Sequence, residues 1–235
     1  MNKEKPAKTH RRTLLVQPNR EWPPLARSLS MRSRVSENLE HARFKLFTFE
    51  KTPLYEAQQK KFEAVQQTND IRFLIQFLQS NPYHHETLLY LSDFLRMQGQ
   101  FQQANELVEK CVYAFEDSWI REFQPIGDTP QTRMDLLEDN LNRVFGESLV
   151  RLIDILGRKG CARTALELCK LVLSLSPQND MFGNLLRIDY YAIRSGELGF
   201  LMRFVEEFVG EFYGNEVQPT ILLLPNLIYS TSLTQ

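Results

Sequence analysis

The sequence is poor in the residues that build disulfide frameworks and metal sites. Its 235 residues include three cysteines, Cys111, Cys161 and Cys169, and no two of them form a CxxC pair. An odd number of widely spaced cysteines argues against a disulfide framework and favours a reducing compartment. His84 and His85 are adjacent but have no further ligand at helical spacing. We therefore expect no metal and no cofactor, and a capping or surface role for both histidines.

Long apolar runs and glycine-rich loops are missing as well. No run approaches the roughly 20 apolar residues that a membrane helix needs. The N-terminus, MNKEKPAKTHRR, is charged and lacks the apolar stretch of a signal peptide. The glycines are isolated, and none forms a phosphate-binding loop. These absences predict a soluble intracellular protein with no membrane contact and no small-molecule substrate.

Charge is distributed unevenly along the chain. Residues 1–45 contain 11 Lys and Arg against 4 Asp and Glu, a net charge of +7, and the remaining residues contain 17 against 25, a net charge of −8. Residues 1–45 also lack helical periodicity, so we expect a basic segment that is extended or disordered. Its basic residues could contact phosphates of ribosomal RNA or act as a nuclear import signal.

Two prolines follow Trp22, and their polyproline geometry would present the indole as an anchor. The candidate contact residues of the basic segment are therefore Arg11, Arg12 and Trp22. The alternative is that the segment simply packs along the flank of the helices.

From residue 53 onwards, apolar residues recur at spacings of three and four, which predicts helices. We expect helical hairpins at about 53–82, 83–116, 142–177 and 180–210, and an incomplete repeat at 216–235. The last unit ends without a return helix, which favours a truncated form of a longer protein.

Two of these hairpins match the tetratricopeptide (TPR) pattern. In each, a glycine that can end a helix precedes a small packing alanine by five residues, Gly99 before Ala104 and Gly160 before Ala165. Pro177 forbids continuation of the last helix of the second hairpin. The fold class is thus expected to be all-α, with a TPR-like solenoid over residues 46–235.

The two alanines are 61 residues apart, whereas TPR units repeat at roughly 34 residues. The difference predicts an insertion at about 116–141, which carries 7 acidic against 2 basic residues over 116–140. We expect an ordinary solvated loop, with a functional insertion as the alternative.

In a TPR array the first helices of successive units line a groove. TPR numbering assigns mixed charges to it, so we expect a mixed or basic ligand. The candidate groove residues are Glu86, Asp93, Arg96, Glu147, Asp154, Arg158, Tyr190 and Arg194.

No pattern of catalytic residues accompanies the repeats. Cys111 and Cys169 fall on packing positions, and Cys161 lies beside a turn without a partner base. We therefore expect a protein that is not an enzyme, with a hydrolase using Cys161 as a remote alternative.

Several short runs are similar to one known family, that of transcription factor 25, whose fungal member is a subunit of the ribosome quality control complex. The resemblance covers roughly residues 12–229. It rests most strongly on RKGCARTALE at 158–167, with Cys169 and Lys170 after it. It also rests on Trp22-Pro23-Pro24, on SNPYH at 80–84, on Leu91-Ser92-Asp93, and on Asn142-Arg143 with Phe145.

The resemblance implies a non-enzymatic scaffold or adaptor that aids ubiquitin-dependent degradation of nascent chains on stalled large ribosomal subunits. It implies as partners the large ribosomal subunit, a listerin-type E3 ubiquitin ligase, a nascent-chain-binding factor and the AAA-type ATPase valosin-containing protein. Such a protein would be cytoplasmic, nuclear or both. The older family name implies an alternative, a nuclear transcriptional corepressor adaptor that acts through protein contacts.

Overall fold

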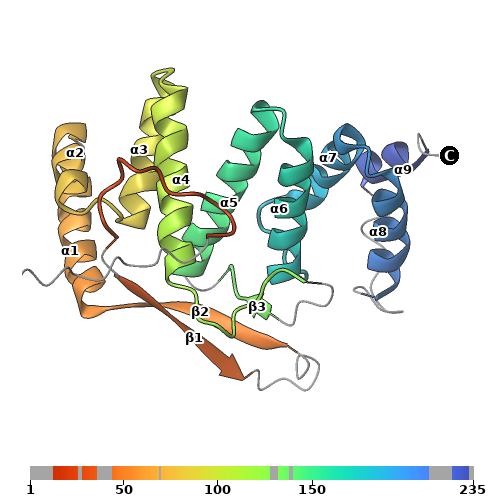
Figure 1. Cartoon of the computed structure of the whole chain (residues 1–235), viewed down its shortest axis with the longest axis horizontal. Coiled ribbons are helices and arrows are strands. Elements are labelled where there is room, and N and C mark those ends of the chain that lie inside the picture. Colours follow the sequence, from red (N-terminus) through yellow and green to blue (C-terminus); the bar gives the residue numbers. More distant parts are fainter. Residues whose placement is uncertain are drawn as a thin grey trace, which may run out of the picture.

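The structure, a computed structural model, describes residues 13–25, 28–35, 44–68, 70–127, 132–137, 140–211 and 224–232. Within these ranges most of the chain is helical, and the helices follow one another in a row (Figure 1). They are α1 (Pro53–Gln67), α2 (Ile71–Ser80), α3 (His85–Met97), α4 (Phe101–Asp117), α5 (Asn140–Arg158), α6 (Ala162–Leu175), the 3-10 turn η2 (Asn184–Leu186), α7 (Ile188–Ser195), α8 (Leu198–Glu211) and α9 (Pro225–Ser232).

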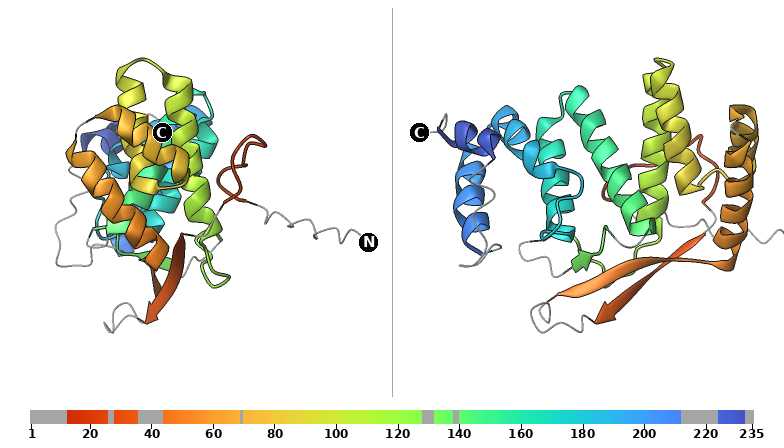
Figure 2. Two further views of the ribbon diagram at one scale, coloured as in Figure 1. Left: turned by 90° about the vertical axis from the view of Figure 1, so that its left-hand side faces the viewer. Right: turned by 180° about the vertical axis from the view of Figure 1, so that it is seen from behind.

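Consecutive helices of the row pack against each other. α3 lies on α4 and α5 lies on α6, while contacts of α4 with α5 and of α6 with α7 join the hairpins (Figure 2). The predicted helical character is therefore confirmed. The assignment to the TPR class of solenoid stays a prediction.

The turns after α3, α5 and α7 are built in the same way. Each helix is followed by a glycine in the left-handed region, with φ of 76° at Gly99, 79° at Gly160 and 75° at Gly196. The amide of Gly160 donates to the carbonyl of Gly157 at 3.2 Å, and the amide of Cys161 donates to the carbonyl of Leu156 at 2.9 Å. This pair of bonds is a Schellman motif, in which only glycine adopts the required φ without strain.

Five residues after each of these glycines comes a fully buried residue. Ala104, Ala165 and Leu201 are each 0% exposed. The first two have small side chains, which let the helices of a hairpin approach closely. Leu201 shows that the α7–α8 hairpin accepts a larger side chain at the corresponding position.

The expectation of an all-α fold is wrong in one respect, because a three-stranded sheet lies along one side of the row (Figure 1). β1 (Leu29–Val35) pairs antiparallel with β2 (Lys45–Lys51), with Leu29 opposite Lys51. β2 also pairs parallel with β3 (Thr132–Met134). β1 lies in the segment expected to be extended or disordered. β3 lies in the expected insertion, so two segments distant in sequence share one sheet.

The insertion is not a solvated loop over its described residues. Phe123, Met134 and Leu136 are 2–4% exposed. The ring of Phe123 lies 5.1 Å from that of Phe47 on β2. The apolar side chains in this acidic stretch therefore fasten it to the sheet.

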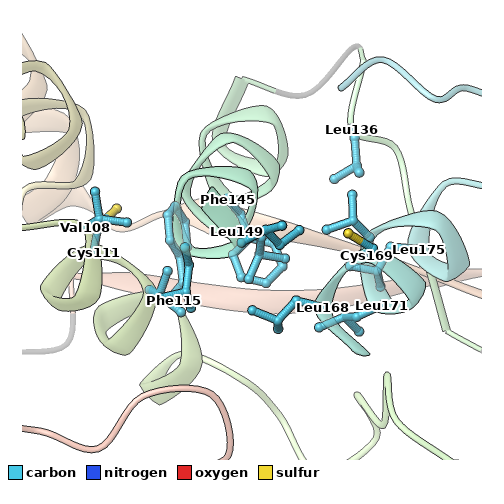
Figure 3. Packing of buried hydrophobic residues seen from close by; sticks show 14 of the residues in the cluster. Val108, Cys111, Phe115, Leu136, Phe145, Leu149, Leu168, Cys169, Leu171 and Leu175 are labelled. Carbon is cyan, nitrogen blue, oxygen red and sulfur yellow. The ribbon is translucent and has the colours of Figure 1, made fainter. Parts of the chain in front are cut away.

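The core joins the sheet to the helices through aromatic rings. Phe49 of β2 lies 4.8 Å from Phe115 of α4 and 5.3 Å from Phe145 of α5, measured between ring centroids. Figure 3 shows Cys111 and Cys169 among apolar side chains of this core, and both thiols are 0% exposed. Their expected packing role is confirmed.

Residues 13–25 run along α4. The amides of Leu14, Leu15 and Val16 donate to the carboxylate of Glu116, at 3.1 Å for Leu15 and 3.4 Å for Val16. Burial raises the pKa of Glu116, against the lowering effect of these three donors. Residues 13–25 of the basic segment thus pack along the flank of the helices, whereas residues 29–35 form β1 of the sheet.

The first helix of the hairpin predicted at about 180–210 is interrupted. Both carboxylate oxygens of Asp180 accept backbone amides, from Asn184 and Leu185, at 2.8 Å each. Gly183 lies in the left-handed region, with φ of 65°. These local bonds compete with helix formation, so a 3-10 turn precedes the short α7.

His84 and His85 are both 1% exposed, so the expected surface role is wrong and the capping role is right for His84. Its Nδ1 accepts the amide of Thr87 at 3.4 Å, and its Nε2 lies 3.1 Å from Gln59 Oε1. Burial, with the nearby charge of Lys51, lowers the pKa of His84 to about 3. Burial also lowers the pKa of His85.

Ala165→Arg should destabilise the protein by about 3–5 kcal/mol, because it forces an unpaired charge into the closed contact between α5 and α6. Thr164→Arg is the matched control, since it adds the same charge at an exposed position of α6. Urea unfolding measures both free energies. Equal stability of the two variants would contradict the hairpin packing.

His84→Asn should reduce the acid sensitivity of the fold. The folded-state pKa of His84 lies below its unfolded value, so the unfolded state takes up the proton first as the pH falls through about 6.5. Stability is then lost by about 1.4 kcal/mol per pH unit for this group. Asparagine can still cap α3 but does not titrate. Unfolding free energies at several pH values should show a shallower slope for the variant, and an identical slope would refute this origin.

Candidate functional site

Four of the candidate groove residues surround one hollow. The hollow has a volume of about 480 Å³ and lies between the last turns of α5 and α7. Its lining residues are Asp154, Gly157, Arg158, Gly160, Tyr190, Tyr191 and Arg194. Two guanidinium groups, two phenols and one carboxylate therefore converge at one place.

Gly157 allows the two helices to approach at this hollow. A Cβ at Gly157 would lie 2.5 Å from Tyr191 Oη, which is closer than van der Waals contact permits. The same hydroxyl lies 3.5 Å from the carbonyl oxygen of Ile153. The glycine thus makes room for the buried tyrosine of α7 against α5.

Arg194 and Tyr190 form the outer wall of the hollow. Arg194 Nη1 donates to Tyr190 Oη at 2.7 Å, and the guanidinium carbon lies 5.6 Å from the centroid of that ring. The Tyr190 side chain is half-exposed, so an aromatic face and a cation are presented to solvent together.

The two aspartates of the candidate groove are already engaged by arginines. Arg151 Nη1 donates to Asp93 Oδ1 at 2.8 Å and to the carbonyl oxygen of Leu89 at 2.9 Å. Arg187 Nη1 donates to Asp154 Oδ1 at 3.1 Å. Each pair connects one hairpin to the next.

These two ion pairs repeat with the hairpins. Asp93 and Asp154 stand six residues before the turn glycine of their unit, and Arg151 and Arg187 stand nine residues before the glycine of the next unit. Repeat numbering did not select the two arginines. Their signal is the shared distance to the glycine, although the choice of partner required the structure.

Arg96 differs from these arginines because it has no such partner. Its Nε and Nη2 atoms are buried and make no hydrogen bond. Burial, followed by the charge of Arg158, lowers the pKa of Arg96, while Asp93 acts in the opposite direction. The guanidinium is therefore partly buried and close enough to both Arg158 and Asp93 to feel their charges.

Four of the candidate groove residues, Glu86, Asp93, Arg96 and Glu147, do not line the hollow. Glu86 accepts from Gln59 Nε2 at 2.8 Å and from Asn140 Nδ2 at 3.0 Å, and so links α1, α3 and the start of α5. Glu147 lies 4.0 Å from both Arg143 and Arg151. Glu86 therefore connects helices within the chain through these two hydrogen bonds.

Of the candidate N-terminal contacts, Arg11 and Arg12 lie outside the described residues. The indole of Trp22 is engaged within the chain. Its Nε1 donates to Glu106 Oε1 at 2.8 Å, and its ring lies 5.7 Å from that of Tyr113. The anchor that the sequence suggested thus fastens the segment to α4.

Cys161 is exposed at the start of α6, beside the turn glycine Gly160. Within the described ranges no group of three or more His, Cys, Asp or Glu side chains could hold a metal ion. No helix among the described residues is long and apolar enough to cross a membrane.

Comparison with known proteins confirms the resemblance noted from the sequence. The family model described as "Transcriptional repressor TCF25" matches residues 47–235. The chain is 34% identical over 224 residues to "Ribosome quality control complex subunit TCF25" of Homo sapiens, which covers 94% of this chain and 31% of the relative. It is 32% identical over 225 residues to "Ribosome quality control complex subunit 1" of Schizosaccharomyces pombe, covering 95% and 32%.

A third relative carries a different name. "Probable transcription factor claV" of Ampulloclitocybe clavipes is 31% identical over 152 residues, which covers 65% of this chain and 19% of the relative. The chain spans about a third of the length of the human and fission yeast relatives. No solved structure matches it. Since the family model matches most of the chain, the chain belongs to the Tcf25 family.

Proposed function

We propose that this chain is a non-enzymatic scaffold of the ribosome quality control complex. The observation that carries the proposal is the similarity, over 94–95% of the chain, to two relatives that are named as subunits of that complex. The partners proposed for it are the large ribosomal subunit, a listerin-type E3 ubiquitin ligase, a nascent-chain-binding factor and an AAA-type ATPase. A cytoplasmic, ribosome-associated location follows from this role.

The row of hairpins supports a scaffold role. Its turns repeat, and its inter-hairpin ion pairs repeat with them, so the helices present a continuous surface to partners. A TPR-like solenoid is the proposed description of this row. The mechanism would be to hold partners in register for ubiquitin-chain formation on the stalled peptide.

The basic segment is proposed to contact ribosomal RNA. Residues 1–45 carry a net charge of +7, and Arg32 and Arg34 on β1 are exposed. Phosphate contacts of this kind weaken as the salt concentration rises.

The chain should co-sediment with large ribosomal subunits from extracts in which translation is stalled, and this association should weaken with salt. Arg32→Glu/Arg34→Glu should lower the bound fraction several-fold. The control is Arg121→Glu/Arg203→Glu, which changes the charge equally at exposed positions outside β1. Absence of the wild-type chain from the large-subunit fraction at low salt would overturn the proposal.

A second candidate is a nuclear transcriptional corepressor adaptor that acts through protein contacts. The description of the family model and the name of the claV relative favour it. A tagged chain should then enter the nucleus and lower the output of a reporter gene when it is tethered upstream. Exclusion of the tagged chain from the nucleus would rule this function out.

A further inference from the structure

We propose that Arg96, Arg158 and Arg194, the arginine row, bind a short acidic peptide segment of a partner protein. The proposal deepens the scaffold function and rests on it, because it names the chemistry of one partner that the scaffold holds. The proposed ligand is acidic, whereas the sequence led us to expect a ligand of mixed or basic charge.

The three arginines occupy corresponding places. Arg158 and Arg194 stand two residues before a turn glycine, and Arg96 stands three residues before one. Figure 1 shows the turns after α3, α5 and α7 on the same side of the molecule. Arg158 and Arg194 line one hollow, and the charge of Arg158 acts on Arg96. The row therefore follows the turns after α3, α5 and α7, and Arg158 and Arg194 share one hollow.

None of the three forms an ion pair with a carboxylate in the part of the chain that the structure describes. Asp93 and Asp154, whose charges act on Arg96, are bonded to Arg151 and Arg187. Arg158 donates only to a backbone carbonyl oxygen, at 3.2 Å. Three guanidinium groups are thus left without a carboxylate partner among the described residues, although residues 46–235 carry a net charge of −8.

The α7–α8 hairpin differs from the α3–α4 and α5–α6 hairpins in that a tyrosine, and not an aspartate, stands beside its arginine of the row. Six residues before its turn glycine stands Tyr190, where the other hairpins have Asp93 and Asp154. Arg194 therefore bonds to a neutral hydroxyl. A carboxylate from a partner would supply the missing charge.

Helix dipoles account for only part of this arrangement. Each helix C-terminus carries about −0.5 elementary charge, which favours a cation there. One such end offsets about half of one guanidinium charge. It does not explain why Arg96 has two buried nitrogens without a hydrogen bond, because a cation placed for the dipole alone would stay hydrated.

The surroundings favour a peptide as the ligand. Guanidinium groups bind carboxylates through two parallel hydrogen bonds. Tyr190 and Ile193 are 50% and 39% exposed and lie on one face of α7, beside Arg194. They would contact an apolar residue next to the acidic ones. The acidic body beyond the row would repel a long polyanion such as RNA.

The test is fluorescence anisotropy with the whole chain and a labelled peptide of Glu and Asp with interspersed Phe and Leu. Wild-type protein should bind it, and Arg158→Glu/Arg194→Glu should weaken binding by about tenfold or more. Arg158→Lys/Arg194→Lys keeps the charge and should show an intermediate loss. Arg96 is left unchanged because it is partly buried.

Arg121→Glu/Arg203→Glu is the matched control, and Arg203, like Arg158, donates to a backbone carbonyl oxygen four residues earlier. Equal weakening by the control, tighter binding of oligouridine, or no binding of the peptide would each overturn the proposal. Thermal unfolding checks that the variants fold. Because the assay contains no ribosomes, its failure would leave the co-sedimentation result untouched.

Discussion

Phe49 makes the contact on which the arrangement of sheet and helices depends. Its ring packs against Phe115 and Phe145, whose rings are themselves 5.2 Å apart. Its amide donates to Asn142 Oδ1 at 3.1 Å. Asn142 also donates to the carbonyl oxygen of Asp135, just after β3. One strand residue thus packs against both α4 and α5, and one asparagine ties β2 and the segment after β3 to α5.

The helical hairpins were predictable from sequence because their signals are local. Apolar periodicity and the glycine before Ala104 and Ala165 act within one unit. The sheet was not predictable in the same way. β3 has three residues and pairs with a strand more than 80 residues earlier, so its existence depends on Phe47 and Phe123 meeting in the core. Only the alternation of Phe47 and Phe49 hinted at β2.

The candidate site was predictable in its residues but not in its charge. TPR numbering selected Asp154, Arg158, Tyr190 and Arg194, and the structure brings these four around one hollow. The TPR numbering could not select Arg151 and Arg187, because the aspartates that they bind lie on neighbouring hairpins. Once each aspartate is paired across a hairpin boundary, the arginines near the turns remain without a carboxylate.

The repeating ion pair and the arginine row are consequences of one constraint. The two ion pairs engage Asp93 and Asp154 with arginines of the next hairpin, and Arg96, Arg158 and Arg194 near the helix ends form no such pair among the described residues. The Schellman glycines fix where α5 and α7 end, and so fix the backbone positions from which Arg158 and Arg194 project. The ion pairs that join neighbouring hairpins therefore occupy the two aspartates, and the arginines near the turns keep their positive charge unpaired among the described residues. In the α7–α8 hairpin Tyr190 stands where the two preceding hairpins have an aspartate. The series of ion pairs ends there, and a half-exposed aromatic ring lies where a partner could reach it.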